Sequence, residues 1–166
     1  MPNWVTNYLK IRKGDPQQVW DTIRGDEDAF DYNRLIPQPS DLYQEPVNFE
    51  MIEANPHNWY TWNNQNWGVK WNAIDVRQEG DHITWDSPWA PPTPVMVKLF
   101  QMFPEHEFRY RWEEEQGFGE TMEVVNGTAT VTSFYFDFEK EVWHEEPPIN
   151  TTLVDWADGP AVAELL

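Results

Sequence analysis

Residues 4–11 read Trp-Val-Thr-Asn-Tyr-Leu-Lys-Ile, and the fold follows from this alternating stretch. In an extended chain, Val5, Leu9 and Ile11 lie on one side. The opposite side carries Trp4, Thr6, Tyr8 and Lys10. A period of two residues is typical of a strand, so this stretch is predicted to form the first β-strand.

A second stretch near residue 110 alternates in the same way. Phe108, Tyr110 and Trp112 are separated by Arg109 and Arg111. The aromatic face should be buried, and the basic face should meet water or acidic side chains. We therefore expect both stretches to lie in one antiparallel sheet, with two helices across one of its faces.

The chain between these stretches carries helix and turn signals. Asp15 is suited to cap a helix over residues 16–24, and Thr93 begins another helix that Pro104 stops. Residues 26–54 are rich in proline and lack a sustained period, which predicts a long irregular excursion with at most a short helix.

A short aromatic helix and a hairpin follow the excursion. Asn55 and Pro56 predict the start of the helix, and Gly68 predicts its end. The two strands of the hairpin are predicted over residues 70–77 and 82–86.

The order strand, helix, excursion, hairpin, helix, strand is the split βαββαβ pattern of ferredoxin-like domains, an α+β fold with helices on one face of the sheet. Asn126-Gly127 lies between two β-rich runs and suits a type I′ turn, which adds a C-terminal β-hairpin. We expect one domain over residues 1–146, including the excursion at 26–54, and a tail or short helix over residues 147–166.

Negative charge is the strongest feature of the composition. The 166 residues include 29 acids and 11 bases, which gives a formal net charge of -18. Residues 104–166 carry 15 acids and 3 bases, a net charge of -12, against -6 for the longer remainder. Phosphate backbones and anionic lipids should repel such a chain, so we expect no direct binding to nucleic acids or membranes.

Several chemistries are disfavoured by what the sequence lacks. The chain has no cysteine, which excludes disulfides, thiolate metal sites and cysteine nucleophiles. The four histidines lack metal-site spacing, and no acidic pair stands out as the acid and base of a hydrolase. We expect no metal, no organic cofactor and no enzymatic activity. We see no signal peptide and no membrane span, and expect a cytoplasmic location.

Several strings, taken in order over residues 1–120, resemble one family. They are Met1-Pro2-Asn3-Trp4, the run from Phe30 to Pro39, Asn66-Trp67-Gly68-Val69-Lys70-Trp71-Asn72-Ala73, the run from Trp85 to Pro94, and the run from Glu113 to Glu120. Together they are similar to the YubB-like family of phage and conjugative-plasmid proteins. The resemblance implies a ferredoxin-like domain and an origin in a mobile element, which favours an accessory or counter-defence role. It implies no reaction.

Two groups of residues are candidates for a binding site. The first is a set of carboxylates that could occupy a basic protein surface: Glu113, Glu114, Glu115, Glu120, Glu123, Glu139, Glu141, Glu145 and Glu146. The second is an aromatic cluster that could form a pocket for a base, sugar or peptide: Trp59, Trp62, Asn66, Trp67, Lys70 and Trp71. Each group also has a plainer interpretation, a solvated face for the acids and core packing for the aromatic residues.

Two functions from different classes are therefore open. As an interaction protein, the chain would bind and inhibit a basic protein by charge mimicry, and that protein would itself bind nucleic acid in the host or its defences. As a small-ligand or nucleotide-binding domain, enzymatic or not, it would use the aromatic cluster. We favour the first, because holding so many like charges on one small domain costs self-repulsion. A salt-rich habitat is a third explanation of the charge.

Overall fold

The computed structural model describes residues 1–158. Eight strands form one sheet in the order β2-β3-β1-β4-β5-β6-β7, and β8 also pairs with β6. The strands are β1 (Trp4–Lys13), β2 (Ile74–Glu79), β3 (His82–Pro88), β4 (Glu107–Glu114), β5 (Phe118–Val125), β6 (Thr128–Asp137), β7 (Val142–Glu145) and β8 (Ile149–Thr152). The helices are α1 (Pro16–Ile23), η1 (Tyr32–Arg34), α2 (Phe49–Ala54), α3 (Trp59–Asn66), α4 (Thr93–Met102) and α5 (Leu153–Ala157).

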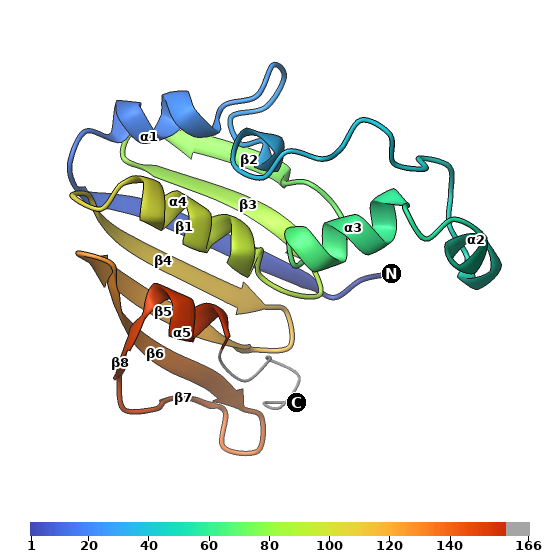
Figure 1. The fold of residues 1–166 in the computed structure, drawn as a ribbon. Helices are drawn as coiled ribbons and strands as arrows, with labels where there is room; N and C mark the ends of the chain where they lie inside the picture. The colour runs from blue at the N-terminus through green and yellow to red at the C-terminus, as the bar shows by residue number, and fades with distance from the viewer. Residues whose placement is uncertain (159–166) are drawn as a thin grey trace.

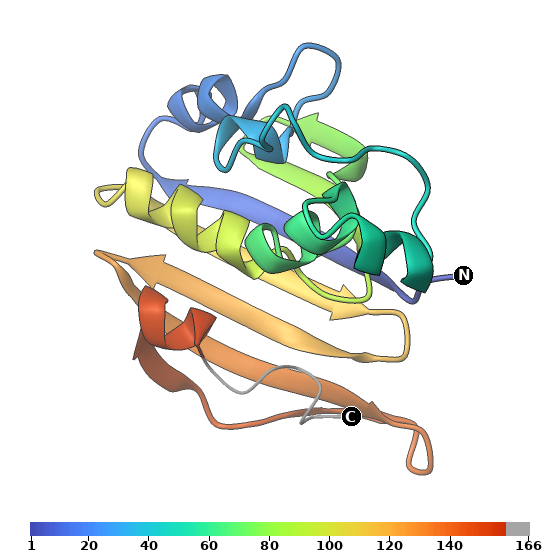
Figure 2. The ribbon, with the colours of Figure 1, turned by 45° about the vertical axis from the view of Figure 1, so that its right-hand side comes forward.

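Strand β1 lies in the middle of the ferredoxin-like part of the sheet. Leu9 lies opposite Ile83 of β3 and Tyr110 of β4, and both pairings are antiparallel. The predicted strand pair is confirmed, and so is the predicted α+β fold. Helices α1, α4 and α5 lie over the same face of the sheet (Figures 1 and 2).

The core fills the space between this covered face and the helices. Alternate residues of the strands point into it, and Leu9, Ile83 and Tyr110 are each 0% exposed. The helices contribute the apolar side chains that recur at helical spacing: Val19, Trp20 and Ile23 from α1, and Val95, Met96, Val97, Leu99 and Phe100 from α4. Burial of these side chains is the main force that holds α1 and α4 on the sheet.

A buried polar chain crosses the three middle strands. Asn7 of β1 is 0% exposed; its Nδ2 donates to Ser87 Oγ of β3 at 2.9 Å, and its Oδ1 accepts from the Tyr110 hydroxyl of β4 at 2.6 Å. Ser87 Oγ in turn donates to the carbonyl of Ala90 at 2.7 Å. Every member therefore has a partner, which is the condition for burying polar groups at little cost.

The C-terminal extension begins with the hairpin predicted at Asn126-Gly127. The two residues have φ angles of 52° and 75°, as a type I′ turn requires, and β5 and β6 pair on either side of them. Strands β7 and β8 then both pair with β6. Residues 149–152 therefore form a strand where we expected a tail or short helix; α5 follows at Leu153–Ala157, and residues 159–166 lie outside the described residues.

Three local expectations were wrong. The cap of α3 is Asn58, whose side chain accepts from the backbone N–H of Thr61, rather than Asn55-Pro56. Strand β2 begins at Ile74, not at residue 70. The excursion holds a short helical turn, η1, as well as α2, and it contributes to the core, because Tyr32 is 0% exposed and accepts a hydrogen bond from Trp85 Nε1.

We predict that Asn7→Ala lowers the free energy of unfolding by about 1–3 kcal/mol, because the buried Tyr110 hydroxyl loses its acceptor. The matched control is Thr6→Ala, one residue along the same strand but exposed on the other face, which should cost about 0.5 kcal/mol or less. Urea denaturation measures both values. Equal effects of the two changes would contradict the structural role of the polar chain.

Candidate functional site

The face of the sheet opposite the helices is open to solvent. Strand β1 places Trp4, Thr6, Tyr8 and Lys10 on it, and cross-strand pairing brings Asp86 of β3 and Glu113 of β4 to either side of Thr6. This is the side of the alternating pattern that sequence analysis left without a role. Large aromatic residues on the polar side of a strand are the signal that could have identified it.

Basic side chains gather on the open face, and most of them already contact a carboxylate. These pairs are Lys10 Nζ with Asp81 Oδ2 at 3.8 Å, Arg12 Nη1 with Glu123 Oε1 at 3.5 Å, Arg109 Nε with Glu123 Oε1 at 3.6 Å, and Arg111 Nη2 with Glu113 Oε2 at 3.1 Å. The expected pairing of the basic face with acids is confirmed for Arg109 and Arg111. Exposed pairs of this kind contribute little stability, but they leave this part of a strongly acidic chain close to neutral.

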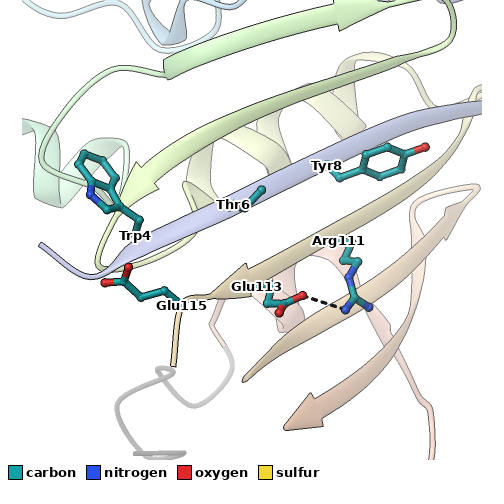
Figure 3. Close-up of a pocket in the computed structure, with 6 residues that line it drawn as sticks. All are labelled: Trp4, Thr6, Tyr8, Arg111, Glu113 and Glu115. Carbon is teal, nitrogen blue, oxygen red and sulfur yellow. Dashed lines mark hydrogen bonds and ion pairs between the residues drawn. The ribbon is translucent and has the colours of Figure 1, made fainter. Parts of the chain in front are cut away.

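A groove opens between the aromatic side chains of β1 and the end of β4 (Figure 3). Its volume is about 410 Å³, and we call it the open-face groove; it is lined by Trp4, Thr6, Tyr8, Arg111, Glu113 and Glu115. Thr6 is a small residue between Trp4 and Tyr8, so the groove is deepest at Thr6. Figure 3 shows Glu115 beside Trp4, and Arg111 on the same side as Tyr8.

Arg111 is held in place from three directions. Its guanidinium lies 3.9 Å from the centre of the Phe134 ring, and it donates to Glu113 Oε2 and to Thr121 Oγ1, each at 3.1 Å. Phe134 can lie flat against β5 because Gly119 opposite it has no side chain; a Cβ there would be 2.7 Å from the ring. The guanidinium of Arg111 therefore already has a cation–π contact and two hydrogen bonds within the chain.

A smaller hollow of about 200 Å³ adjoins the groove and shares Thr6 with it. Asp86 lies in this hollow and accepts a hydrogen bond from Thr6 Oγ1 at 3.2 Å. Burial raises the pKa of Asp86, and the charge of Asp75 adds to the rise. The residues that line the two hollows come from β2, β3, β1 and β4 and from the turn after β4, and they include four carboxylates and two arginines.

The far end of the sheet presents a different surface, which we call the distal hairpin (residues 135–146, joining β6 to β7). Phe138 is 70% exposed and Trp143 is 51% exposed. The hairpin holds five acids and one lysine, a net charge of -4. Asp137 serves the turn itself: the backbone N–H of Lys140, more than that of Glu139, holds its pKa below the ordinary value.

The predicted acidic set does not form one face. Glu113 and Glu123 are paired on the open face, and Glu115 is exposed beside the groove. Glu114 and Glu120 lie on the covered face instead, since neighbouring residues of a strand point in opposite directions. The remaining four are exposed on the distal hairpin: Glu139, Glu141, Glu145 and Glu146.

The two acids of the covered face are structural. Glu114 is 2% exposed, and one of its oxygens accepts from the backbone N–H of Gln116 at 2.7 Å. Glu120 accepts from Trp112 Nε1 at 3.1 Å. Burial raises the pKa of Glu120 above its ordinary 4.5, while hydrogen bonds from Trp112 and Trp156 oppose the rise.

We predict that Glu120→Gln unfolds at a higher temperature than the unchanged chain at pH 7. The folded state raises the pKa of this carboxyl, so its stability contribution falls as the pH rises above 4.5, and a neutral acceptor avoids that loss. The difference in melting temperature should close as the pH falls below 4.5. Glu120→Ala is the control, because it also removes the acceptor for Trp112 and should be less stable than Glu120→Gln at every pH. A difference that does not change with pH would refute the assignment.

The predicted aromatic pocket is largely used in packing. Trp67 is 2% exposed, donates from Nε1 to the carbonyl of Ile36 at 2.8 Å, and meets the edge of Trp62 at 5.5 Å. Trp59 Nε1 donates to the carbonyl of Glu45, and the Asn66 side chain donates to the carbonyl of Trp62. Neither hollow described above is lined by this cluster.

Lys70 and Trp71 are the two members of the cluster that approach the open face. Lys70 Nζ lies 4.5 Å from the centre of the Trp71 ring. The Trp71 ring in turn lies 6.2 Å from the ring of Trp4. A cation stacked on an aromatic ring therefore sits next to the open-face groove.

Two features are absent from residues 1–158. In this part of the chain, no group of three or more histidine, aspartate and glutamate side chains is placed to hold a metal ion. No helix within it is long and apolar enough to cross a membrane.

Comparison with known proteins gives one match. A family model described as the ferredoxin-like domain in Api92-like protein matches residues 66–152, which is 87 of the 166 residues. The match runs from the end of α3 through β8 and so includes the C-terminal strands. No curated protein and no solved structure matches the chain.

Proposed function

The chain belongs to the family of ferredoxin-like domains in Api92-like proteins, and we propose that it is a non-enzymatic interaction protein that binds a basic protein surface. One observation carries this proposal. The distal hairpin combines exposed aromatic side chains with glutamates that make no ion pair within residues 1–158. No arrangement of catalytic groups competes with it among the residues described above.

The aromatic side chains give the hairpin a contact surface rather than a merely solvated one. Trp143 packs against Phe134 at 5.7 Å and Phe136 at 5.2 Å, and Phe138 meets Phe136 at 4.9 Å. These rings hold one another in place, so little side-chain entropy remains to be lost on binding. Rigid aromatic residues are enriched in the centres of protein interfaces, where they contribute much of the binding energy.

The glutamates around these rings select the partner by charge. A basic surface would be steered toward a protein of net charge -18, and unlike charges would meet at the rim of the aromatic patch. A second copy of this chain is a poor partner, because two hairpins of net charge -4 would repel each other. A basic protein therefore fits the distal hairpin best.

The partner that we propose is a nucleic-acid-binding protein of the host or its defences. Such a protein carries a phosphate-binding surface of complementary charge, and occupation of that surface would inhibit it. The proposed setting is the cytoplasm of a cell that carries a phage or conjugative plasmid. The resemblance to YubB-like proteins supports this setting.

Charge reversal tests the proposal. Glu139, Glu141, Glu145 and Glu146, all changed to Lys, should weaken capture of purified basic DNA-binding proteins by about tenfold or more at low salt. The matched control reverses four exposed glutamates near the other end of the sheet, and so changes the net charge equally: Glu27, Glu45, Glu50 and Glu53.

Two further measurements separate the contribution of charge to capture from that of the aromatic side chains. Capture by the unchanged protein should fall steeply when salt is raised from about 50 to about 300 mM, because exposed charges are then screened. Trp143→Ala should weaken capture without changing its salt dependence. If the control weakens capture as much as the hairpin variant, net charge acts without a defined site and the proposal fails.

A further inference from the structure

We infer that the open-face groove receives a cationic side chain, arginine or lysine, from the basic partner. The inference rests on the proposed function and assigns it a second contact, on the middle strands rather than on the distal hairpin. The two surfaces are neighbours at the β4–β5 turn. A Cβ placed on Gly117 in that turn would lie 3.8 Å from Phe138 and 3.9 Å from Trp143.

The walls of the groove suit a cation. Trp4 and Tyr8 lie four residues apart on one face of β1, which separates their Cα atoms by about 13 Å. Thr6 leaves the space between them unfilled. A guanidinium or ammonium group in that space would reach an aromatic face, an arrangement that becomes stronger when the site is closed off from water.

The same stretch of surface already pairs cations with aromatic rings. Lys70 stacks on Trp71, which contacts Trp4, and Arg111 stacks on Phe134 at 3.9 Å. In both cases the chain supplies its own cation. Trp4 and Tyr8 have no cation on them within residues 1–158, although Tyr8 stacks with the ring of His82 at 5.6 Å.

The carboxylates of the groove provide the charge-assisted hydrogen bonds. Glu115 is exposed beside Trp4, and no ion pair joins it to another residue within the described chain. Glu113 contacts Arg111 through Oε2, which leaves Oε1 without a hydrogen bond inside residues 1–158. A guanidinium could therefore contact two carboxylates and an aromatic face at once.

An anion fits the groove less well. Arg111 is the one cation among the six lining residues. Its guanidinium already stacks on Phe134 and donates hydrogen bonds to Thr121 and Glu113. A phosphate would meet Glu113 and Glu115, whereas Lys70 lies outside the six lining residues and already stacks on Trp71. Single-stranded nucleic acid could stack its bases on Trp4 and Tyr8, but its phosphates would be repelled.

The test uses three small probes that differ in charge and shape: N-acetylarginine amide, N-acetyllysine amide and N-acetylcitrulline amide. Citrulline has the shape of arginine without the charge. The binding of each probe is followed by NMR, through the indole N–H signal of Trp4 in the full chain. We expect saturable shifts with the two cations and at least about a tenfold weaker response with citrulline.

Substitutions in the groove locate the site, with a charge-matched control on the distal hairpin. Glu113→Gln and Glu115→Gln together should weaken arginine-amide binding about tenfold or more. Trp4→Leu should abolish it, and because this variant lacks the indole, its titration is followed through the backbone N–H signal of Thr6. Glu145→Gln with Glu146→Gln removes the same charge from the distal hairpin and should leave the probe titration unchanged. Equal binding of citrulline and arginine amides, or saturable binding of a single-stranded oligonucleotide at Trp4, would overturn the assignment.

The outcomes separate this inference from the proposed function. If arginine amide fails to bind but reversal of the hairpin charges still weakens protein capture, the groove assignment is wrong and the proposed function stands. If arginine amide binds at Trp4 but substitutions in neither the groove nor the distal hairpin weaken protein capture, the proposed function is wrong. In that case the groove would remain a site for a free cationic ligand.

Discussion

A buried asparagine on the central strand fixes the arrangement on which the candidate sites depend. Asn7 links Ser87 of β3 to Tyr110 of β4 through one amide, and all three residues are buried. A shift of β1 by one residue would bring its polar face into the core and leave these groups unpaired. The same register places Thr6 and Tyr8 on the opposite face. The position of the open-face groove is therefore a consequence of the packing beneath it.

Covering one face of the sheet divides the charged residues into three populations. The two acids of the covered face accept hydrogen bonds within the fold: Glu120 from Trp112 Nε1, and Glu114 from the backbone N–H of Gln116. On the open face, Glu113 and Glu123 pair with arginines and Asp81 pairs with Lys10, so the carboxylates without an ion pair within residues 1–158 lie at the two hollows, among them Asp86 and Glu115. The surplus of carboxylates is left on exposed turns, above all on the distal hairpin, where rigid aromatic rings accompany it. A net charge of -18 thus becomes a few local surfaces with different partners.

The sequence predicts this fold well wherever a regular period is decisive, as in β1, β4 and α4, or where a turn needs a positive φ angle, as at Asn126. It predicts the sites less well because their geometry depends on contacts between distant residues. The run Glu113-Glu114-Glu115 looks like one acidic cluster, yet strand geometry sends its middle member into the core. The aromatic cluster looks like a pocket, but the excursion folds back and offers the Ile36 carbonyl to Trp67. No local pattern indicates that contact.

The two surfaces make different demands on a partner, and their placement limits how the partner can bind. The distal hairpin offers a broad aromatic patch with a charged rim, whereas the groove admits one side chain. Both border the β4–β5 turn, whose Glu115 lines the groove and whose Gly117 lies against the aromatic rings of the hairpin. A partner that rests on the hairpin can therefore extend one basic side chain across this turn and reach Trp4. A flat, evenly charged partner could satisfy the hairpin alone, so occupation of the groove would select among basic proteins that the net charge attracts equally.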